Sequence, residues 1–214
     1  MKPSAVIFDF DGTIADTEWE IYSYVNAVYE AHGLTTSLEA WVQSIGRADN
    51  RPLEEHLGDR LGRAPDADVI EEVKAKHWER RYTVPMRPGV QLLIEAVTAA
   101  AMPLAVASSS PTAWVEPHLE RLEIRHHFAA VRTRDHVERG KPEPDLFYAA
   151  AAALEIDPAE ILVIEDSKHG CAAAKAAGMT CVVVPNRITK LDIPTDADLV
   201  LDSLEDFPFA DFNL

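Results

Sequence analysis

Two aspartates separated by one residue follow the first apolar run of the chain. The run AVIF (5–8) leads into the letters DFDGT, which begin at Asp9 and place Asp11 directly before Gly12. Side chains alternate along an extended chain, so Asp9 and Asp11 point to the same side. Two carboxylates that close repel each other unless a cation or a proton intervenes. The pair could therefore hold a hard dication such as Mg²⁺ or divide the roles of nucleophile and acid. An acidic turn at Asp11-Gly12 is the simpler alternative.

Polar residues suited to a phosphoryl group follow three further strand-like runs. Three serines (108–110) come after PLAVA, Lys141 precedes two prolines in GKPEP, and Glu165 and Asp166 follow ILVI. Each has an ordinary explanation when taken alone, such as a loop, a solvated lysine or the acidic start of a helix. Because each group comes at the end of such a run or in a stiff turn, their joint occurrence favours one shared phosphate site.

The elements that must position these residues alternate along the chain. Five short apolar runs have the character of buried parallel strands: 5–8, 103–107, 161–164, 181–184 and 198–201. Helical patterns lie between them, over 88–101, 143–154 and 167–177. Ser167 is suited to cap the last of these helices and Gly178 to end it. The alternation predicts a Rossmann-like, doubly wound α/β fold, whose ligands bind at the carboxyl ends of the strands.

One region interrupts the alternation. Residues 17–84, called the helical insert below, contain no convincing buried strand, and their apolar residues recur at helical spacing. We therefore expect two domains, a catalytic core formed by 1–16 and 85–214 and a small all-helical cap formed by 17–84. An insert that begins beside the end of the first strand is placed to act as a lid over the site there. The alternative is a separate interaction module.

The composition limits the classes of function. The chain has 214 residues, 47% of them apolar, and a formal net charge of −16. Such acidity disfavours nucleic acid and anionic membranes as partners, and no apolar stretch approaches the roughly 18–20 residues of a membrane span. The beginning of the chain lacks the layout of a signal peptide, and Cys171 and Cys181 are expected to be buried thiols. We expect a cytoplasmic protein, and the sequence does not indicate its oligomeric state.

The motifs taken together resemble the haloacid dehalogenase-like superfamily, in its phosphatase and β-phosphoglucomutase-like branch with a helical cap. The resemblance covers nearly the whole chain and rests on four motifs in order: DFDGT (9–13), ASSS (107–110), GKPEPDLF (140–147) and IEDSKHGCAAAKAAGM (164–179). The letters DTE (16–18) open the cap as in that branch. The Rossmann-like core with an inserted cap that the family implies agrees with the independent reading of the strands.

The resemblance implies a role for each matching residue. Asp9 would be the nucleophile that forms an aspartyl-phosphate, and Asp11 the acid that protonates the leaving alkoxide and later deprotonates water. Mg²⁺ would be held by Asp9, the backbone carbonyl of Asp11 and Asp166, with Glu165 acting through water or from the second shell of ligands. Phosphate and substrate contacts are expected from Ser108, Ser109, Lys141 and Arg47, with Arg51 as a further anion contact.

Three functions remain open at this point. The first is a Mg²⁺-dependent phosphatase acting on a small phosphorylated metabolite, of the sugar phosphate or phosphoglycolate type. The second is a phosphomutase, and the third, of another class, is a non-catalytic protein that binds phosphorylated metabolites. Hexose phosphomutases of this branch carry a His where Ile21 stands and an Arg where Asp49 stands, which favours the phosphatase. The presence of Asp11 disfavours a dehalogenase, because that branch lacks the second acid.

Overall fold

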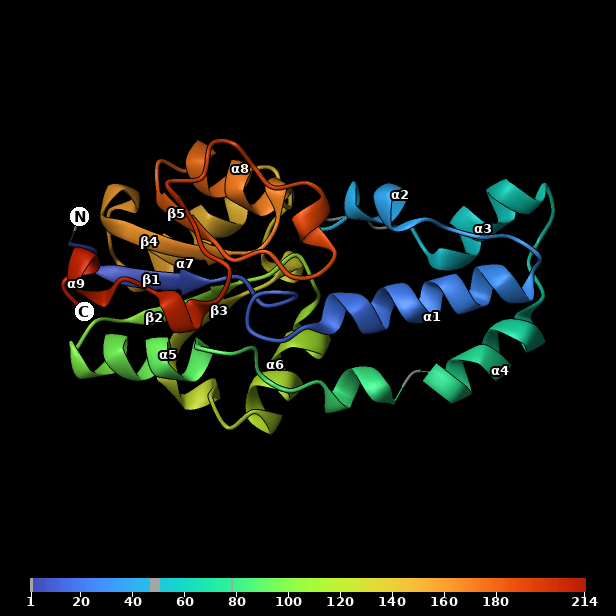
Figure 1. The fold of residues 1–214 in the computed structure, drawn as a ribbon, viewed down its shortest axis with the longest axis horizontal. Helices are drawn as coiled ribbons and strands as arrows, with labels where there is room; N and C mark the ends of the chain where they lie inside the picture. The colour runs from blue at the N-terminus through green and yellow to red at the C-terminus, as the bar shows by residue number, and fades with distance from the viewer. Residues whose placement is uncertain (1, 47–50, 78) are drawn as a thin grey trace.

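The computed structural model describes residues 2–46, 51–77 and 79–214. Its centre is a parallel sheet of six strands in the order β3-β2-β1-β4-β5-β6 (Figure 1). The strands are β1 (Ala5–Phe8), β2 (Leu104–Ala107), β3 (Phe128–Arg132), β4 (Ile161–Glu165), β5 (Thr180–Val183) and β6 (Leu199–Val200). This order reverses direction between β1 and β4, where a doubly wound sheet opens a crevice for its ligand. The predicted α/β fold is confirmed, while β3 was missed by the sequence analysis.

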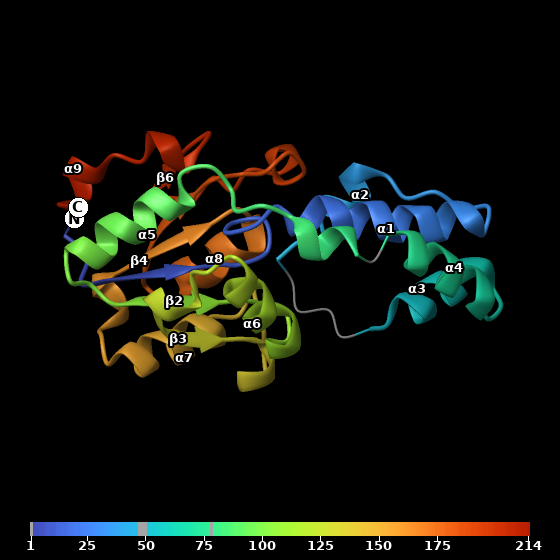
Figure 2. The same cartoon turned by 90° about the horizontal axis from the view of Figure 1, so that it is seen from below.

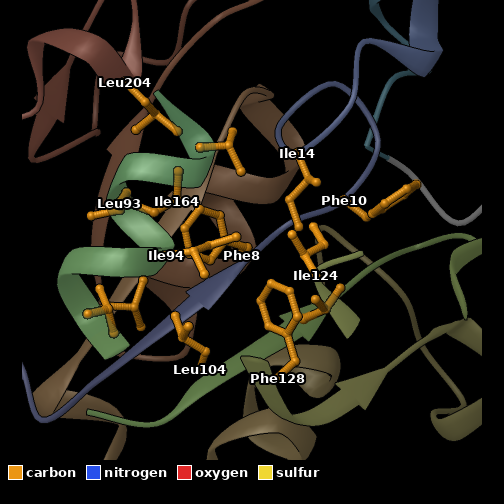
Figure 3. Close-up of a cluster of buried hydrophobic side chains, with 14 of the residues drawn as sticks. Phe8, Phe10, Ile14, Leu93, Ile94, Leu104, Ile124, Phe128, Ile164 and Leu204 are labelled. Carbon is orange, nitrogen blue, oxygen red and sulfur yellow. The ribbon is translucent and has the colours of Figure 1, made fainter. Parts of the chain in front are cut away.

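Helices cover both faces of the sheet because the strands are apolar on both faces. In β1, Val6 and Phe8 point into one buried cluster and Ala5 and Ile7 into the other. The first cluster packs under α5 (Val90–Ala99) and α6 (Thr112–Arg121), and Figure 3 shows Phe8 of β1 among side chains of α5 and β3. The second packs under α7 (Asp145–Leu154) and α8 (Lys168–Ala176). The chain closes with the short helix α9 (Phe209–Phe212).

The start and end of α8 follow the predicted local chemistry. The Ser167 side chain accepts a hydrogen bond from the Gly170 N–H at 3.1 Å, which satisfies one of the free donors of the first turn. Gly178 follows the helix with φ of +79°, a conformation that glycine adopts without steric cost. Both residues thus fix where α8 lies relative to the end of β4.

The helical insert forms a unit of its own beyond the carboxyl ends of the strands, opposite the two chain termini (Figures 1 and 2). Its helices are α1 (Thr17–Ala31), α2 (Leu38–Val42), α3 (Leu53–Leu61) and α4 (Ala67–His77), followed by a 3₁₀ turn at Arg80–Thr83. A small apolar cluster that includes Val28, Leu57 and Ile70 holds them together. The described part of the insert contains helices and no strand, as predicted.

The segment after α2 brings the insert into contact with the core. The Ile45 carbonyl lies 2.9 Å from His169 Nδ1, and the Gly46 carbonyl accepts a hydrogen bond from the Ser109 hydroxyl at 3.1 Å. Gly46 has φ of +77°, and a Cβ there would meet Ser167 Oγ at 2.4 Å. Only a glycine therefore allows this segment to pass so close to α8.

Two expectations about the chain as a whole can be compared with the structure. Cys171 and Cys181 are both buried free thiols, as predicted. Among the helices in the described ranges, none combines the length and the apolar character that crossing a membrane requires.

Candidate active site

The candidate site lies where β1, β2 and β4 end side by side. The Asp9 N–H still donates to the Ile164 carbonyl at 2.9 Å, and the Ser108 N–H donates to the Arg132 carbonyl at 2.9 Å. The sheet ladder therefore continues one residue past β1 and β2. This continuation carries Asp9 and Ser108 to the same edge of the sheet as Asp166.

Lys141 links two of the predicted acids in the interior of the core. Its ammonium donates to Asp9 Oδ1 and to Glu165 Oε1, both at 2.6 Å, and its side chain is fully buried. Burial alone would lower the pKa of Lys141, but the charges of Asp9 and Glu165 outweigh it and raise the pKa above its ordinary value. Lys141 is therefore a fixed positive charge beside the carboxylate of Asp9.

Glu165 is held by the start of α8. Its Oε2 accepts hydrogen bonds from the N–H groups of Asp166 and Ser167, at 3.0 and 3.1 Å, and from the Ser167 hydroxyl at 3.0 Å. Since Oε1 already accepts from Lys141, both oxygens of Glu165 are engaged with protein donors. Gly170 permits this arrangement, because a Cβ at Gly170 would come within 1.8 Å of Glu165 Oε1. Glu165 thus orients the lysine and the strand end.

Three buried acids lie close together at this edge of the sheet. Ligand atoms of Asp9, Glu165 and Asp166 all lie within 4.8 Å of one another. Asp9 Oδ2 is buried and has no hydrogen-bond partner among the described residues. Burial raises the pKa of Asp9 to about 7, with Lys141 opposing the shift and Glu165 and Asp11 adding to it. An unpartnered oxygen among buried carboxylates suits a hard divalent cation, which prefers such ligands.

Asp166 is held in place from outside the predicted motifs. The Asn186 amide donates to Asp166 Oδ2 at 2.7 Å, and the Thr189 hydroxyl lies 3.4 Å from the same oxygen. Gly12, with φ of +84°, passes so near that a Cβ would meet Asp166 Oδ2 at 2.4 Å. Burial and the charges of neighbouring acids raise the pKa of Asp166 well above its usual range. Sequence reasoning gave no role to Asn186.

Arg87 fastens the loop after β1 to the end of β5. Its guanidinium donates to the carbonyls of Gly12, Val184 and Pro185, the last two at 2.8 and 3.1 Å. The sequence analysis did not identify Arg87. Arg87 lies just after the insert and before an apolar helix, and no local sequence pattern there marks it as part of the site.

Asp11 is surrounded by donors from three segments. The Thr17 hydroxyl and the Trp114 indole N–H donate to Oδ1 at 2.6 and 2.7 Å. The Ser110 hydroxyl donates to Oδ2 at 2.5 Å, and the Ser108 hydroxyl lies 3.5 Å from the same oxygen. Asp11 is therefore fixed by the first turn of α1 as well as by the core. Trp114 was missed, and Ser110 was noted only as part of the serine run.

Ser109 and Arg51, two of the remaining predicted contacts, line the same cavity as Asp9 and Asp11 and also contact other protein groups. The Ser109 hydroxyl donates to the Gly46 carbonyl of the insert, so the structure gives it a contact other than the expected phosphate. Arg51 forms ion pairs with Asp59 at 2.7 Å and Glu55 at 3.4 Å. Arg47 lies outside the described residues, as does Asp49. The role expected for Arg47 therefore stays a prediction.

A cavity of about 450 Å³ opens between the candidate site and the helical insert. Asp9, Asp11 and Asp166 line it together with Ser109, Ser110, Pro111 and Arg134 of the core. Side chains of α1, α2 and α3 and of the segments beside them, Arg51 included, line the side formed by the insert. The site thus joins the Asp9 carboxylate, a fixed ammonium and a second acid at one end of a space large enough for a small metabolite.

Comparisons with known proteins point to one family. The family model described as haloacid dehalogenase-like hydrolase matches residues 6–184. The YhcW protein of Bacillus subtilis is 36% identical over 96% of this chain and 94% of its own length. The phosphorylated carbohydrates phosphatase of Thermotoga maritima is 31% identical over 82% of each chain. A crystal structure of a CbbY variant from Rhodobacter sphaeroides in complex with xylulose-1,5-bisphosphate superposes with a TM-score of 0.74, at 27% identity over 96% of both chains.

Proposed function

Since this chain belongs to the haloacid dehalogenase-like hydrolases and is a phosphoric monoester hydrolase, we propose that it dephosphorylates small phosphorylated metabolites with Asp9 as nucleophile and Mg²⁺ as cofactor. The observation that carries the proposal is the state of the Asp9 carboxylate. Lys141 holds Oδ1 at 2.6 Å, while Oδ2 is buried in the cavity wall and has no partner among the residues that the structure describes.

The charges at this end of the cavity suit phosphoryl transfer. Asp9, Asp166 and the backbone carbonyl of Asp11 would hold Mg²⁺, which supplies positive charge to the phosphoryl oxygens and reduces their repulsion from the acids. Lys141 adds a second positive charge that needs no proton exchange, because its pKa is raised. Such fixed charges favour the transition state, in which negative charge spreads over the equatorial oxygens.

The chemistry divides between the two aspartates. An oxygen of Asp9 forms a bond to phosphorus as the ester P–O bond breaks, and a proton from Asp11 passes to the leaving alkoxide. Asp11 then accepts a proton from water, whose oxygen attacks phosphorus and releases inorganic phosphate and free Asp9. Ser108 and Ser110 keep Asp11 oriented, since their hydroxyls lie 3.5 and 2.5 Å from its Oδ2.

The helical insert is proposed to be the cap that closes this site. Its segment at Ile45 and Gly46 rests on the core next to Ser109 and His169, and it walls the outer part of the cavity. The phosphorylated carbohydrates and the xylulose bisphosphate named for the relatives support a substrate of similar size.

Release of inorganic phosphate from a library of phosphorylated metabolites, with and without Mg²⁺, tests the proposal. We expect Mg²⁺-dependent release from p-nitrophenyl phosphate and from a subset of sugar or polyol phosphates. A folded protein that releases no phosphate from p-nitrophenyl phosphate, acetyl phosphate or the library would contradict the proposal and favour a binding protein.

A further inference from the structure

The buried acids at the strand ends have few oxygen atoms left for a cation. Asp9 Oδ1 accepts from Lys141, and the two oxygens of Glu165 accept from Lys141 and from the start of α8. Asp9 Oδ2 has no partner among the described residues. The way in which a cation is held here therefore depends on how many oxygens Asp166 can offer beside Asp9 Oδ2.

Asp166 has one oxygen committed to a protein donor. The Asn186 amide donates to Asp166 Oδ2 at 2.7 Å, and both residues are buried. The Thr189 hydroxyl lies 3.4 Å from the same oxygen. On the side of Oδ1, the Thr13 hydroxyl lies at 3.5 Å, which is the outer limit of a hydrogen bond. Asp166 thus leaves Oδ1 to the site and has Oδ2 engaged.

The turn after β5 fixes the direction of the Asn186 amide. Its Oδ1 accepts from the N–H groups of Ile188 and Thr189, at 2.8 and 3.0 Å. Because the amide oxygen is used in this way, the NH₂ group must face Asp166. Ile188 is fully buried in a cluster shared with the insert, and a Cβ at Gly12 would meet Asn186 Nδ2 at 2.6 Å. The amide therefore has no room to turn away from Asp166.

The two common hard dications differ in what they need from a carboxylate. Ca²⁺ takes roughly six to eight oxygen ligands and uses carboxylates through one oxygen or both. Mg²⁺ takes about six at shorter distances, and it binds through one or two carboxylates while water and substrate oxygens complete its shell. Acids that each offer one fixed oxygen therefore suit Mg²⁺ and provide too few ligands for Ca²⁺.

We propose that Asn186 is a positioning residue that determines cation selectivity: by holding Asp166 Oδ2 it restricts Asp166 to one ligand oxygen and so selects Mg²⁺ against Ca²⁺. The inference rests on the proposed function and deepens it, because it assigns the choice of cofactor to a residue outside the acids. Asn186 acts through Asp166 and takes no part in phosphoryl transfer.

Calorimetric titration of the full chain with Mg²⁺ alone and with Ca²⁺ alone measures the two dissociation constants. In the unsubstituted protein we expect Ca²⁺ to bind no more tightly than Mg²⁺. Asn186→Ser keeps an oxygen that can accept from the N–H groups of the turn and removes the N–H that holds Asp166. Mg²⁺ affinity should then fall about tenfold, the usual result of losing a group that orients a metal ligand. Ca²⁺ affinity should hold or rise, because Asp166 Oδ2 becomes available.

Two further variants identify the cause of that shift. Asn186→Asp keeps the shape and the acceptor oxygen, and its added charge should raise both affinities, yet their ratio should move toward Ca²⁺ as it does in Asn186→Ser. Ile188→Val loosens the packing of the same turn and keeps the amide, so it should lower Tm and leave the ratio unchanged. Ca²⁺ should also inhibit Mg²⁺-dependent turnover of p-nitrophenyl phosphate at about tenfold lower concentration in Asn186→Ser than in the control.

The outcomes distinguish this inference from the proposed function. If the unsubstituted protein binds Ca²⁺ more tightly than Mg²⁺, or if Asn186→Ser weakens both cations equally, the inference is wrong while the phosphatase stands. The first of these measurements needs no variant, so it tests the inference even where a substitution prevents folding. If Mg²⁺ neither binds to the unsubstituted protein nor supports release of phosphate, the proposed function itself fails.

Discussion

The indole N–H of Trp114 donates a hydrogen bond to Asp11 Oδ1 at 2.7 Å. An indole nitrogen can only donate, so this oxygen always accepts. The hydroxyl of Ser110, 2.5 Å from Oδ2, can instead reverse and accept. Oδ1 also accepts from the Thr17 hydroxyl at 2.6 Å, so the donor-only indole on Oδ1 favours Oδ2 as the oxygen that carries a proton. We therefore expect Trp114 to favour delivery of the proton from Oδ2 of the proposed acid.

Replacing Trp114 by Phe should weaken proton delivery without removing the ring. We expect kcat/KM for an alkyl phosphate to fall about tenfold or more, and for p-nitrophenyl phosphate to change little, because an aryl leaving group needs less protonation. The ring contacts with His118 at 4.2 Å and Tyr82 at 5.5 Å should survive. Trp19→Phe, outside the cavity lining, is the control. Equal losses for both esters would show that Trp114 acts only on the fold.

Much of the site was predictable because a parallel sheet aligns the ends of its strands. Asp9, Ser108 and Asp166 each follow an apolar run, and the register of β1 with its neighbours brings those ends together. The motif around Lys141 was also recognisable in sequence. The sequence did not reveal the binding partners of Lys141, whose ammonium bridges Asp9 and Glu165.

The residues that sequence reasoning missed act through contacts between distant segments. Trp114 reaches Asp11 from α6, and Arg87 reaches the carbonyl of Gly12 on one loop and those of Val184 and Pro185 on another. No local spacing therefore marks either residue. Strand β3 was missed for another reason. Its apolar run FAAV contains two alanines, which are depleted in strands, and it follows the polar stretch EIRHH, so its composition does not mark it as a strand.

Asp9→Asn should abolish turnover and leave the fold intact. The amide preserves the shape and can still accept from Lys141, but it cannot serve as the phosphoryl acceptor. We expect kcat to fall by at least about a thousandfold, with binding of a substrate measured by calorimetry within about threefold of the unsubstituted protein. Residual turnover within tenfold would exclude Asp9 as the nucleophile.

Removal of divalent metal should abolish activity, and Mg²⁺ should restore it. The raised pKa of the buried acids also predicts how the stabilisation of the fold by Mg²⁺ depends on pH. The folded-state pKa of Asp9 is raised from 3.8 to about 7, so proton binding stabilises the metal-free protein below about pH 4, and this contribution is lost as the pH rises through 7. The proposed cation would replace the proton once Asp9 is ionised.

The rise in Tm caused by Mg²⁺ should therefore be larger at pH 8 than at pH 5. At a Mg²⁺ concentration of about 100 Kd the stabilisation is about 2.7 kcal/mol, or roughly 5–10 °C for a domain of this size. Differential scanning fluorimetry measures it, and Asp166→Asn should reduce the shift at pH 8. Full activity after verified metal removal, or a Tm shift that does not depend on pH, would contradict this account.

Two helical glycines provide a matched pair for the support of Glu165. A Cβ at Gly170 would lie 1.8 Å from Glu165 Oε1, whereas a Cβ at Gly58 would meet only ordinary contacts, the nearest being Arg63 O at 3.5 Å. Gly170→Ala should displace Glu165 and Lys141, reduce turnover at least about a hundredfold and lower the free energy of unfolding by about 1–3 kcal/mol. Gly58→Ala should raise it by about 0.5–1 kcal/mol. Equal activity in both variants would show that Glu165 does not need its present position.

Hydrolysis should prevail over transfer of the phosphoryl group back to a sugar. A mutase must keep water from its phosphoenzyme until the sugar intermediate has rebound, and related hexose phosphomutases use a His at the position of Ile21 for this control. Ile21 lines the cavity on α1 and can neither donate nor accept a hydrogen bond, so water should remain the acceptor. The test is ³¹P NMR of β-glucose 1-phosphate with a trace of glucose 1,6-bisphosphate, beside a β-phosphoglucomutase as positive control. We expect inorganic phosphate to form and glucose 6-phosphate to stay at background; faster formation of glucose 6-phosphate than of phosphate would identify a mutase.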